Sequence, residues 1–99
     1  MEMKRTINGH EMTISLEGRL DTNSSPAFEK ELNTILPDVT DLTFDLAALK
    51  YVSSAGLRVL LMAQKAMNAK HGKMVIRNCN DDLMDIFEVT GFVDILNIE

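Results

Sequence analysis

The hydrophobic pattern of this chain of 99 residues switches repeatedly between the period of a strand and the period of a helix. Met12, Ile14 and Leu16 alternate with polar residues, which is typical of a half-buried strand. From Phe28 onward, apolar residues recur at spacings of four, seven and eight, which predicts a helix with one buried face. Strands that alternate with helices favour right-handed crossovers and a mainly parallel sheet. We therefore expect an α/β fold.

The whole pattern has the order β-β-α-β-α-β-α-β, and we interpret residues 1–99 as one domain. The expected sheet is mixed and mostly parallel, with four or five strands and helices packed on it. Its first two strands form a hairpin within residues 3–19, joined by the turn dipeptide Asn8-Gly9. Next we expect a helix with Ser25 as N-cap that ends at Pro37-Asp38, then a strand at 42–46 and a loop at 47–51. A helix at 54–70 follows, with Gly72 at its C′ position, and leads to a strand at 73–77. The last expected elements are a helix capped by Asn80 and stopped by Gly91, and an edge strand at 92–98.

The composition argues against several classes of protein. Hydrophobic residues make up 45% and charged residues 25%, which is typical of a folded domain. The net charge of −5 and the pI near 4.9 argue against a nucleic-acid partner, which favours a basic face. No apolar run approaches the roughly 20 residues that cross a bilayer, and the first residues lack the apolar core of a signal peptide. We expect a cytoplasmic protein without nucleic-acid binding or membrane insertion.

The residues that usually bind metals are few and scattered. Cys79 is the single cysteine, which excludes an internal disulfide and a site with several cysteines. His10 and His71 are far apart and lie near expected turns, where solvated histidines are common. No acid–base pair and no nucleophile–histidine pair is visible. The sequence therefore predicts no metal, no cofactor and no enzyme activity.

Two adjacent serines, Ser53 and Ser54, lie at the start of the longest expected helix, shortly after a predicted strand. The start of a helix exposes N–H groups without intrahelical partners, and the macrodipole makes that end positive. A serine at this position either caps the helix or carries a phosphate, whose charge is favoured there. The residues alone leave both interpretations open.

Three motifs along the chain together resemble one known family. The first is Gly18-Arg19-Leu20-Asp21, which is similar to the family pattern Gly-x-Leu-Asp. The second is Tyr51-Val52-Ser53-Ser54-Ala55-Gly56-Leu57, which is similar to an acid or serine followed by Ser-(Ser/Thr/Ala)-Gly-Leu. The third is Leu83 to Phe92, which is similar to a final helix closed by Gly-Leu or Gly-Phe. In this order and at these separations they resemble the STAS domain, and more narrowly the bacterial anti-sigma factor antagonists. The resemblance covers nearly the whole chain.

The resemblance implies a regulatory switch. In the family, the unphosphorylated antagonist binds a partner that is both anti-sigma factor and serine kinase, which frees the sigma factor. Phosphorylation of one serine abolishes this binding, and a PP2C-type phosphatase resets the switch. Alignment on Gly56 places Ser54 at the phosphorylated position, although established members usually carry an acid where this chain has Ser53. We prefer Ser54 to Ser53 as the phosphorylation site, because Ser53 is the natural N-cap.

The resemblance also suggests which residues surround the phosphorylated serine. If the strands before the two motif loops are parallel neighbours, Asp21 comes close to Ser53 and Ser54. There it would accept a hydrogen bond from the serine hydroxyl or orient the serine in the kinase site. The other candidates for partner binding are Thr22, Ala55, Gly56 and Arg58.

Two further functions are weighed against the switch. The first is a STAS subunit of a lipid-transport complex or another multiprotein assembly, with a constant partner and no phosphorylation. The second is a nucleotide-binding module, for which the chain has no glycine-rich phosphate loop. Each of these alternatives is also a binding protein.

Overall fold

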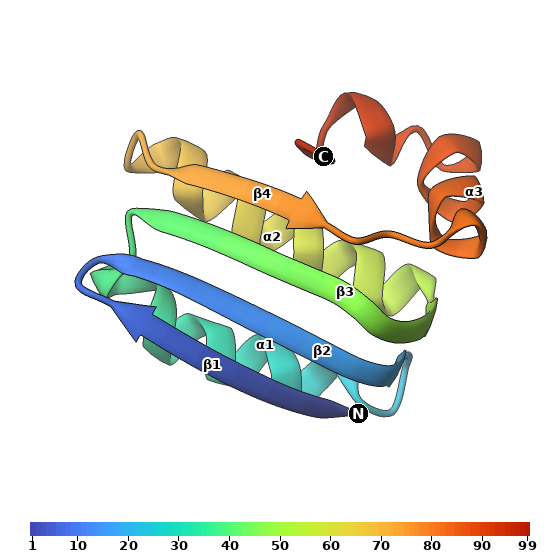
Figure 1. The fold of residues 1–99 in the computed structure, drawn as a ribbon, viewed down its shortest axis with the longest axis horizontal. Coiled ribbons are helices and arrows are strands. Elements are labelled where there is room, and N and C mark those ends of the chain that lie inside the picture. The colour runs from blue at the N-terminus through green and yellow to red at the C-terminus, as the bar shows by residue number, and fades with distance from the viewer.

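The computed structural model describes all 99 residues and contains one sheet with the strand order β1-β2-β3-β4 (Figure 1). β1 is antiparallel to β2, whereas β2 and β3, and β3 and β4, are parallel. The strands are β1 (Glu2–Asn8), β2 (Glu11–Leu20), β3 (Asp41–Val52) and β4 (Lys73–Arg77). The predicted α/β class and the mixed, mostly parallel sheet are therefore confirmed.

Three helices and two short 3-10 turns complete the fold. They are α1 (Ser25–Ile35), η1 (Leu36–Asp38), α2 (Ser54–Ala69), α3 (Asp81–Val89) and η2 (Phe92–Asp94). Figure 1 shows α1 and α2 behind the sheet, whereas α3 lies beyond the carboxyl end of β4. The opposite face of the sheet, toward the viewer, is not covered by a helix. No helix is long and apolar enough to cross a membrane.

The hydrophobic core lies between the sheet and its two covering helices. Alternate side chains of β2 and β3, such as Leu16 and Phe44, are fully buried. Phe28 of α1 packs edge-on against Phe44, with 6.0 Å between the ring centroids. The apolar stripe predicted for α1 is confirmed, because Phe28, Leu32 and Ile35 are all buried.

β3 is longer than the sequence predicted. We expected it to end at residue 46 and to be followed by a loop, but it pairs with β2 as far as Val52. The register shifts between Ser15 and Glu17 and again between Gly18 and Arg19, which are the marks of β-bulges. The bulges interrupt the two-residue alternation of buried side chains, so the pattern of residues 47–51 did not indicate a strand.

The predicted element ends are displaced by one residue at three positions. The hairpin turn is Gly9-His10, because Asn8 still pairs with Glu11. The N-cap of α1 is Ser24, and Ser25 is the first helical residue, whose hydroxyl donates to the Asp21 carbonyl at 2.5 Å. The C′ position of α2 belongs to His71, not to Gly72.

His71 has a φ of 60°, the left-handed conformation in which helices commonly end. Gly72 follows and approaches its neighbours closely, because a Cβ there would lie 2.7 Å from the Thr40 carbonyl oxygen. The Gly72 N–H donates to the Met67 carbonyl and the His71 N–H to the Asn68 carbonyl, which together form a Schellman motif. Gly72 is thus needed for packing rather than for its φ angle.

The C-terminal segment does not form the predicted strand. Residues 92–98 instead contain η2 and a single parallel bridge between Ile76 and Ile98. The predicted ends of α3 are confirmed, since Asn80 accepts from the Leu83 N–H at 2.9 Å and Gly91 follows the helix with a φ of 80°. The sheet accordingly has four strands.

Candidate functional site

The two loops predicted to meet do lie side by side, because β2 and β3 are parallel neighbours. The Ser53 N–H donates to the Leu20 carbonyl at 2.8 Å, which joins the carboxyl ends of the two strands. Asp21 follows directly in one loop, and Ser54 follows in the other. The backbone thus brings the two motif segments together, as predicted.

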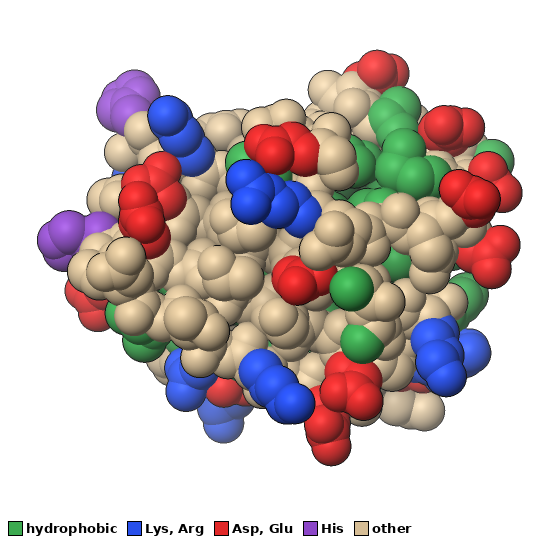
Figure 2. Space-filling model, viewed as in Figure 1, with side chains coloured by type: hydrophobic (Ala, Val, Ile, Leu, Met, Phe, Trp, Pro, Cys, Tyr) green, Lys and Arg blue, Asp and Glu red, His purple; other side chains and the backbone are tan.

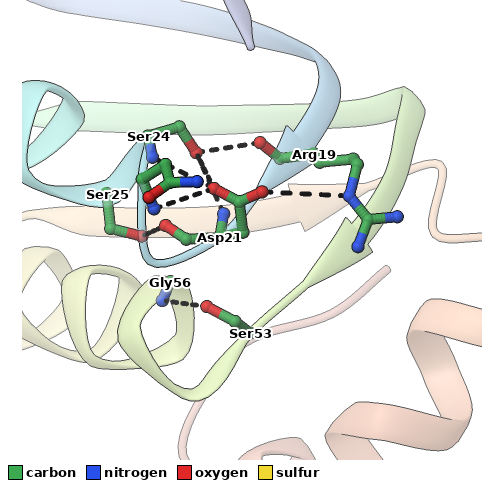
Figure 3. Close-up of polar contacts among 7 residues, drawn as sticks. Arg19, Asp21, Ser24, Ser25, Ser53 and Gly56 are labelled. Atoms are coloured by element: carbon green, nitrogen blue, oxygen red, sulfur yellow. Dashed lines mark hydrogen bonds and ion pairs between the residues drawn. The ribbon is translucent and has the colours of Figure 1, made fainter.

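The two adjacent serines have different surroundings. Ser53 is the N-cap of α2, and its side-chain oxygen accepts from the Gly56 N–H at 3.3 Å (Figure 3). Ser54 is the first residue of α2, is exposed and makes no side-chain hydrogen bond within the protein. The capping role predicted for Ser53 is confirmed, so the free hydroxyl at this helix start is that of Ser54.

Gly56 lets α2 begin directly above the ends of β2 and β3. A Cβ at this position would lie 2.7 Å from Leu20 Cγ, 2.8 Å from the Leu20 carbonyl oxygen and 2.9 Å from Val52 Cγ2. These separations are too short for a side chain. Gly56 is itself buried, so its part in the site is to place the start of α2 rather than to contact a partner.

Asp21 is held by its own loop. Its Oδ1 accepts from the N–H groups of Asn23 at 3.0 Å and Ser24 at 3.1 Å, and from the Ser24 hydroxyl at 3.2 Å (Figure 3). These bonds, above all the one from the Ser24 N–H, hold the pKa of Asp21 below its usual value. No hydrogen bond joins Asp21 to Ser53 or Ser54, so the expected contact with a serine hydroxyl is absent.

Arg19 connects this loop with β3, a contact that sequence analysis missed. Its Nε lies 3.8 Å from Asp21 Oδ2, and its guanidinium lies 4.4 Å from the centre of the Tyr51 ring. Arg19 and Tyr51 each belong to one of the motifs recognised in the sequence, and the register of β2 and β3 places these two residues opposite each other. Such a cation over an aromatic face is attracted by the ring quadrupole.

A groove of about 390 Å³, here called the α2–α3 groove, begins at the two serines. Tyr51, Ser54 and Leu57 line one part of it, and Asp85, Ile86 and Val89 of α3 line another. The α3 side of this groove was not predicted, because the helical period of a sequence indicates only the buried face of a helix. Thr90, the C-cap of α3, is exposed and also lines the groove.

The other predicted partner-binding residues lie in a second hollow, between α1 and α2. Thr22, Ala55 and Arg58 line this hollow together with Pro26, Glu29 and Met62, and Ser54 does not. Arg58 is exposed and forms no ion pair. Asp21 lines neither of these hollows but a third one, beside Arg19 and Ser24. The predicted partner surface is therefore divided over three hollows.

Comparison with known proteins gives consistent results for sequence and fold. The family model described as "Mlab, STAS domain" matches residues 3–97. The anti-sigma-B factor antagonist of Bacillus subtilis (strain 168) is 26% identical over 91 residues, which cover 92% of this chain and 84% of that protein. The anti-sigma-B factor antagonist of Listeria monocytogenes is 28% identical over 100 residues, which cover 100% of this chain and 87% of that protein.

Solved structures show the same fold. The anti-sigma factor antagonist SpoIIAA in its unphosphorylated form has a TM-score of 0.79 at 16% identity, covering 99% of this chain and 87% of its own. Bacillus SpoIIAA in the phosphorylated form has a TM-score of 0.78 at 17% identity, covering 99% and 91%. With the family model matched over residues 3–97, these comparisons show that the chain belongs to the STAS domain family.

Proposed function

We propose that this STAS domain is an anti-sigma factor antagonist controlled by phosphorylation of Ser54. In its unphosphorylated form it binds an anti-sigma factor that is also a serine kinase, and the sigma factor is released. The names of the Bacillus and Listeria relatives support the antagonist role, and the two solved forms of SpoIIAA support a switch based on phosphate in this fold. The proposed activity is binding, not catalysis.

The observation that carries this proposal is the difference between the two serine hydroxyls. Ser53 is engaged as the N-cap of α2, whereas Ser54 is exposed and unpaired at the first position of the helix. A kinase needs a serine hydroxyl that it can reach without breaking the helix start. Ser54 meets that requirement, and Ser53 does not.

A phosphate on Ser54 would change the surface more than the fold. It adds roughly 1.5 to 2 negative charges and three acceptor oxygens at a helix N-terminus. The first turn of α2 carries no acidic residue, so the helix dipole there has no competing negative charge. In a protein interface, however, the phosphate would lose its hydration, which weakens binding. A loss of about 5.5 kcal/mol is enough to change the ratio of bound to free protein from 99:1 to 1:99.

The remaining steps of the switch follow from this chemistry. A PP2C-type phosphatase would remove the phosphate and restore binding. Asp21, whose pKa is lowered still further from neutral pH, would contribute its negative charge beside the site. The kinase would take the phosphate from ATP, and the phosphatase would release it as inorganic phosphate by hydrolysis. Both partners are expected to be cytoplasmic, and this chain itself needs no cofactor.

The test is to incubate the purified protein with its candidate kinase and ATP and to locate the modified residue by mass spectrometry. We expect one phosphate, on Ser54. Ser54→Ala should bind the anti-sigma factor whether or not ATP is present, and Ser54→Asp should bind at least tenfold more weakly. Ser53→Ala is the matched control and should still be phosphorylated. If no phosphate is incorporated and Ser54→Asp binds like the wild type, the switch is wrong for this protein.

A second candidate function has one specific observation in its favour. The matching family model is described by the name Mlab, rather than by an antagonist of an anti-sigma factor. The chain would then be a permanent subunit of a multiprotein assembly, such as a lipid-transport complex, and would not be phosphorylated. Co-purification from its own organism separates the two, since a stable assembly without an anti-sigma factor supports only the second.

A further inference from the structure

We infer that the α2–α3 groove is the place where the anti-sigma factor docks, by inserting an apolar side chain between Tyr51 and Val89 and placing basic residues against the acids of α3. This inference rests on the proposed function, and it adds the surface and the chemistry of the partner segment.

Large apolar side chains are exposed at this groove. Val89 is 87% exposed, more than any other large hydrophobic residue of the chain, and Tyr51 is 36% exposed. Both line the groove, next to the half-buried Ile86. Apolar surface gathered in one hollow commonly marks a binding site.

The α3 helix beside the groove is acidic. The helix carries Asp81, Asp82, Asp85 and Glu88 and no basic residue, and none of these acids forms an ion pair. Figure 2 shows Asp and Glu side chains around this end of the molecule. Asp81 and Asp82 favour the helix start, but Glu88 lies in the last turn, at the negative end of the dipole.

Glu88 and Val89 are therefore adjacent residues whose placement does not stabilise the free domain. One is an acid at the wrong end of a helix, and the other is an apolar side chain in water. A partner segment with an apolar residue next to Lys or Arg compensates both at once. A second copy of this chain does not fit equally well, because pairing α3 with α3 would bring acid against acid.

The groove is continuous with the proposed phosphorylation site. Ser54 lines the same groove, so a phosphate on it would occupy the space that the apolar side chain needs. The Tyr51 ring, which lines the groove, is also in cation–π contact with Arg19, and Arg19 forms an ion pair with Asp21. The phosphate thus blocks docking by its volume and by its need for hydration, even though the partner segment is basic.

The test uses the anti-sigma factor identified in the phosphorylation assay and measures its affinity for unphosphorylated variants by calorimetry. Val89→Asp should weaken binding at least tenfold. Glu88→Lys should weaken it about three- to tenfold and reduce the dependence of affinity on salt concentration. The matched controls are Ile7→Asp, at a side chain 64% exposed on β1, and Glu11→Lys, at the far end of the sheet; both should bind like the wild type.

The outcomes separate the two proposals. If the wild type binds the anti-sigma factor and the Val89→Asp and Glu88→Lys variants of α3 bind it equally well, the docking inference is overturned and the antagonist function stands. If no anti-sigma factor binds the wild type, the proposed function fails and the docking inference fails with it. Thermal unfolding of each variant guards against misfolding, and Val89→Ser provides a milder change if Val89→Asp is unstable.

Discussion

Gly56 illustrates how a single residue controls the position of the site. In the middle of an ordinary helix, replacing glycine by alanine stabilises by about 1 kcal/mol. Here the added Cβ would lie 2.7 Å from Leu20 Cγ and 2.8 Å from the Leu20 carbonyl oxygen, and the latter cannot move without the strand. Because α2 approaches β2 so closely, alanine at position 56 should destabilise the protein, whereas helix propensity alone predicts that it would stabilise it.

We accordingly predict that Gly56→Ala lowers the free energy of unfolding by about 1–3 kcal/mol, the usual cost of overpacking. Urea denaturation measures this change. Lys65→Ala, an exposed position of the same helix, is the control and should change stability by less than about 0.5 kcal/mol. A stabilised Gly56→Ala variant would mean that α2 does not approach β2 this closely.

At the scale of an element, the start of α2 depends on one serine and not on the other. Ser53→Ala removes the acceptor of the Gly56 N–H and should cost about 1 kcal/mol. Ser54→Ala removes a hydroxyl without a partner, and alanine is a better helix former, so stability should stay the same or rise slightly. Denaturation curves of the two variants test the assignment, and equal losses would contradict it.

The loop between β2 and α1 should respond to acid through Asp21. Because the folded state lowers the pKa of Asp21 below 3.8, this residue adds stability above that pH, which is lost as the pH falls through the folded-state pKa. Asp21→Asn keeps an acceptor oxygen but has no charge to lose. We predict that the variant is less stable than the wild type at pH 7 and that this difference narrows as the pH falls below 3.8, as measured by denaturation at several pH values. A difference that persists unchanged at low pH would exclude the charge as its cause.

At the scale of the whole molecule, phosphorylation should leave the fold intact. The chain has a net charge of −5, so further negative charge is mildly unfavourable overall, but α2 offers an uncompensated positive end. If Ser54 is the site, the phosphorylated protein should unfold within about 5 °C of the unphosphorylated one, which corresponds to about 1 kcal/mol for a domain of this size. Scanning calorimetry of the two forms measures the shift. A much larger fall would mean that the switch works by unfolding.

The predictable parts of this molecule are those that depend on neighbours along the chain. The stripe of Phe28, Leu32 and Ile35, the cap at Asn80 and the stop at Gly91 were all recognisable, because each is a pattern of residue types within about two helical turns. Other features were not recognisable. The extension of β3 to Val52 depends on bulges between it and β2, and residues 92–98 formed a turn and one bridge where a strand was expected.

The sequence by itself determined the order of the four strands and three helices that form, the cap at Ser53 and the pair of candidate serines, because periodicity and capping are local properties. Only the tertiary structure decided that Ser54 shares a groove with α3, that Asp21 is held by its own loop and that Arg19 covers Tyr51. These features depend on how segments distant in sequence are placed by strand register and by the close contact at Gly56. No local pattern contains that information.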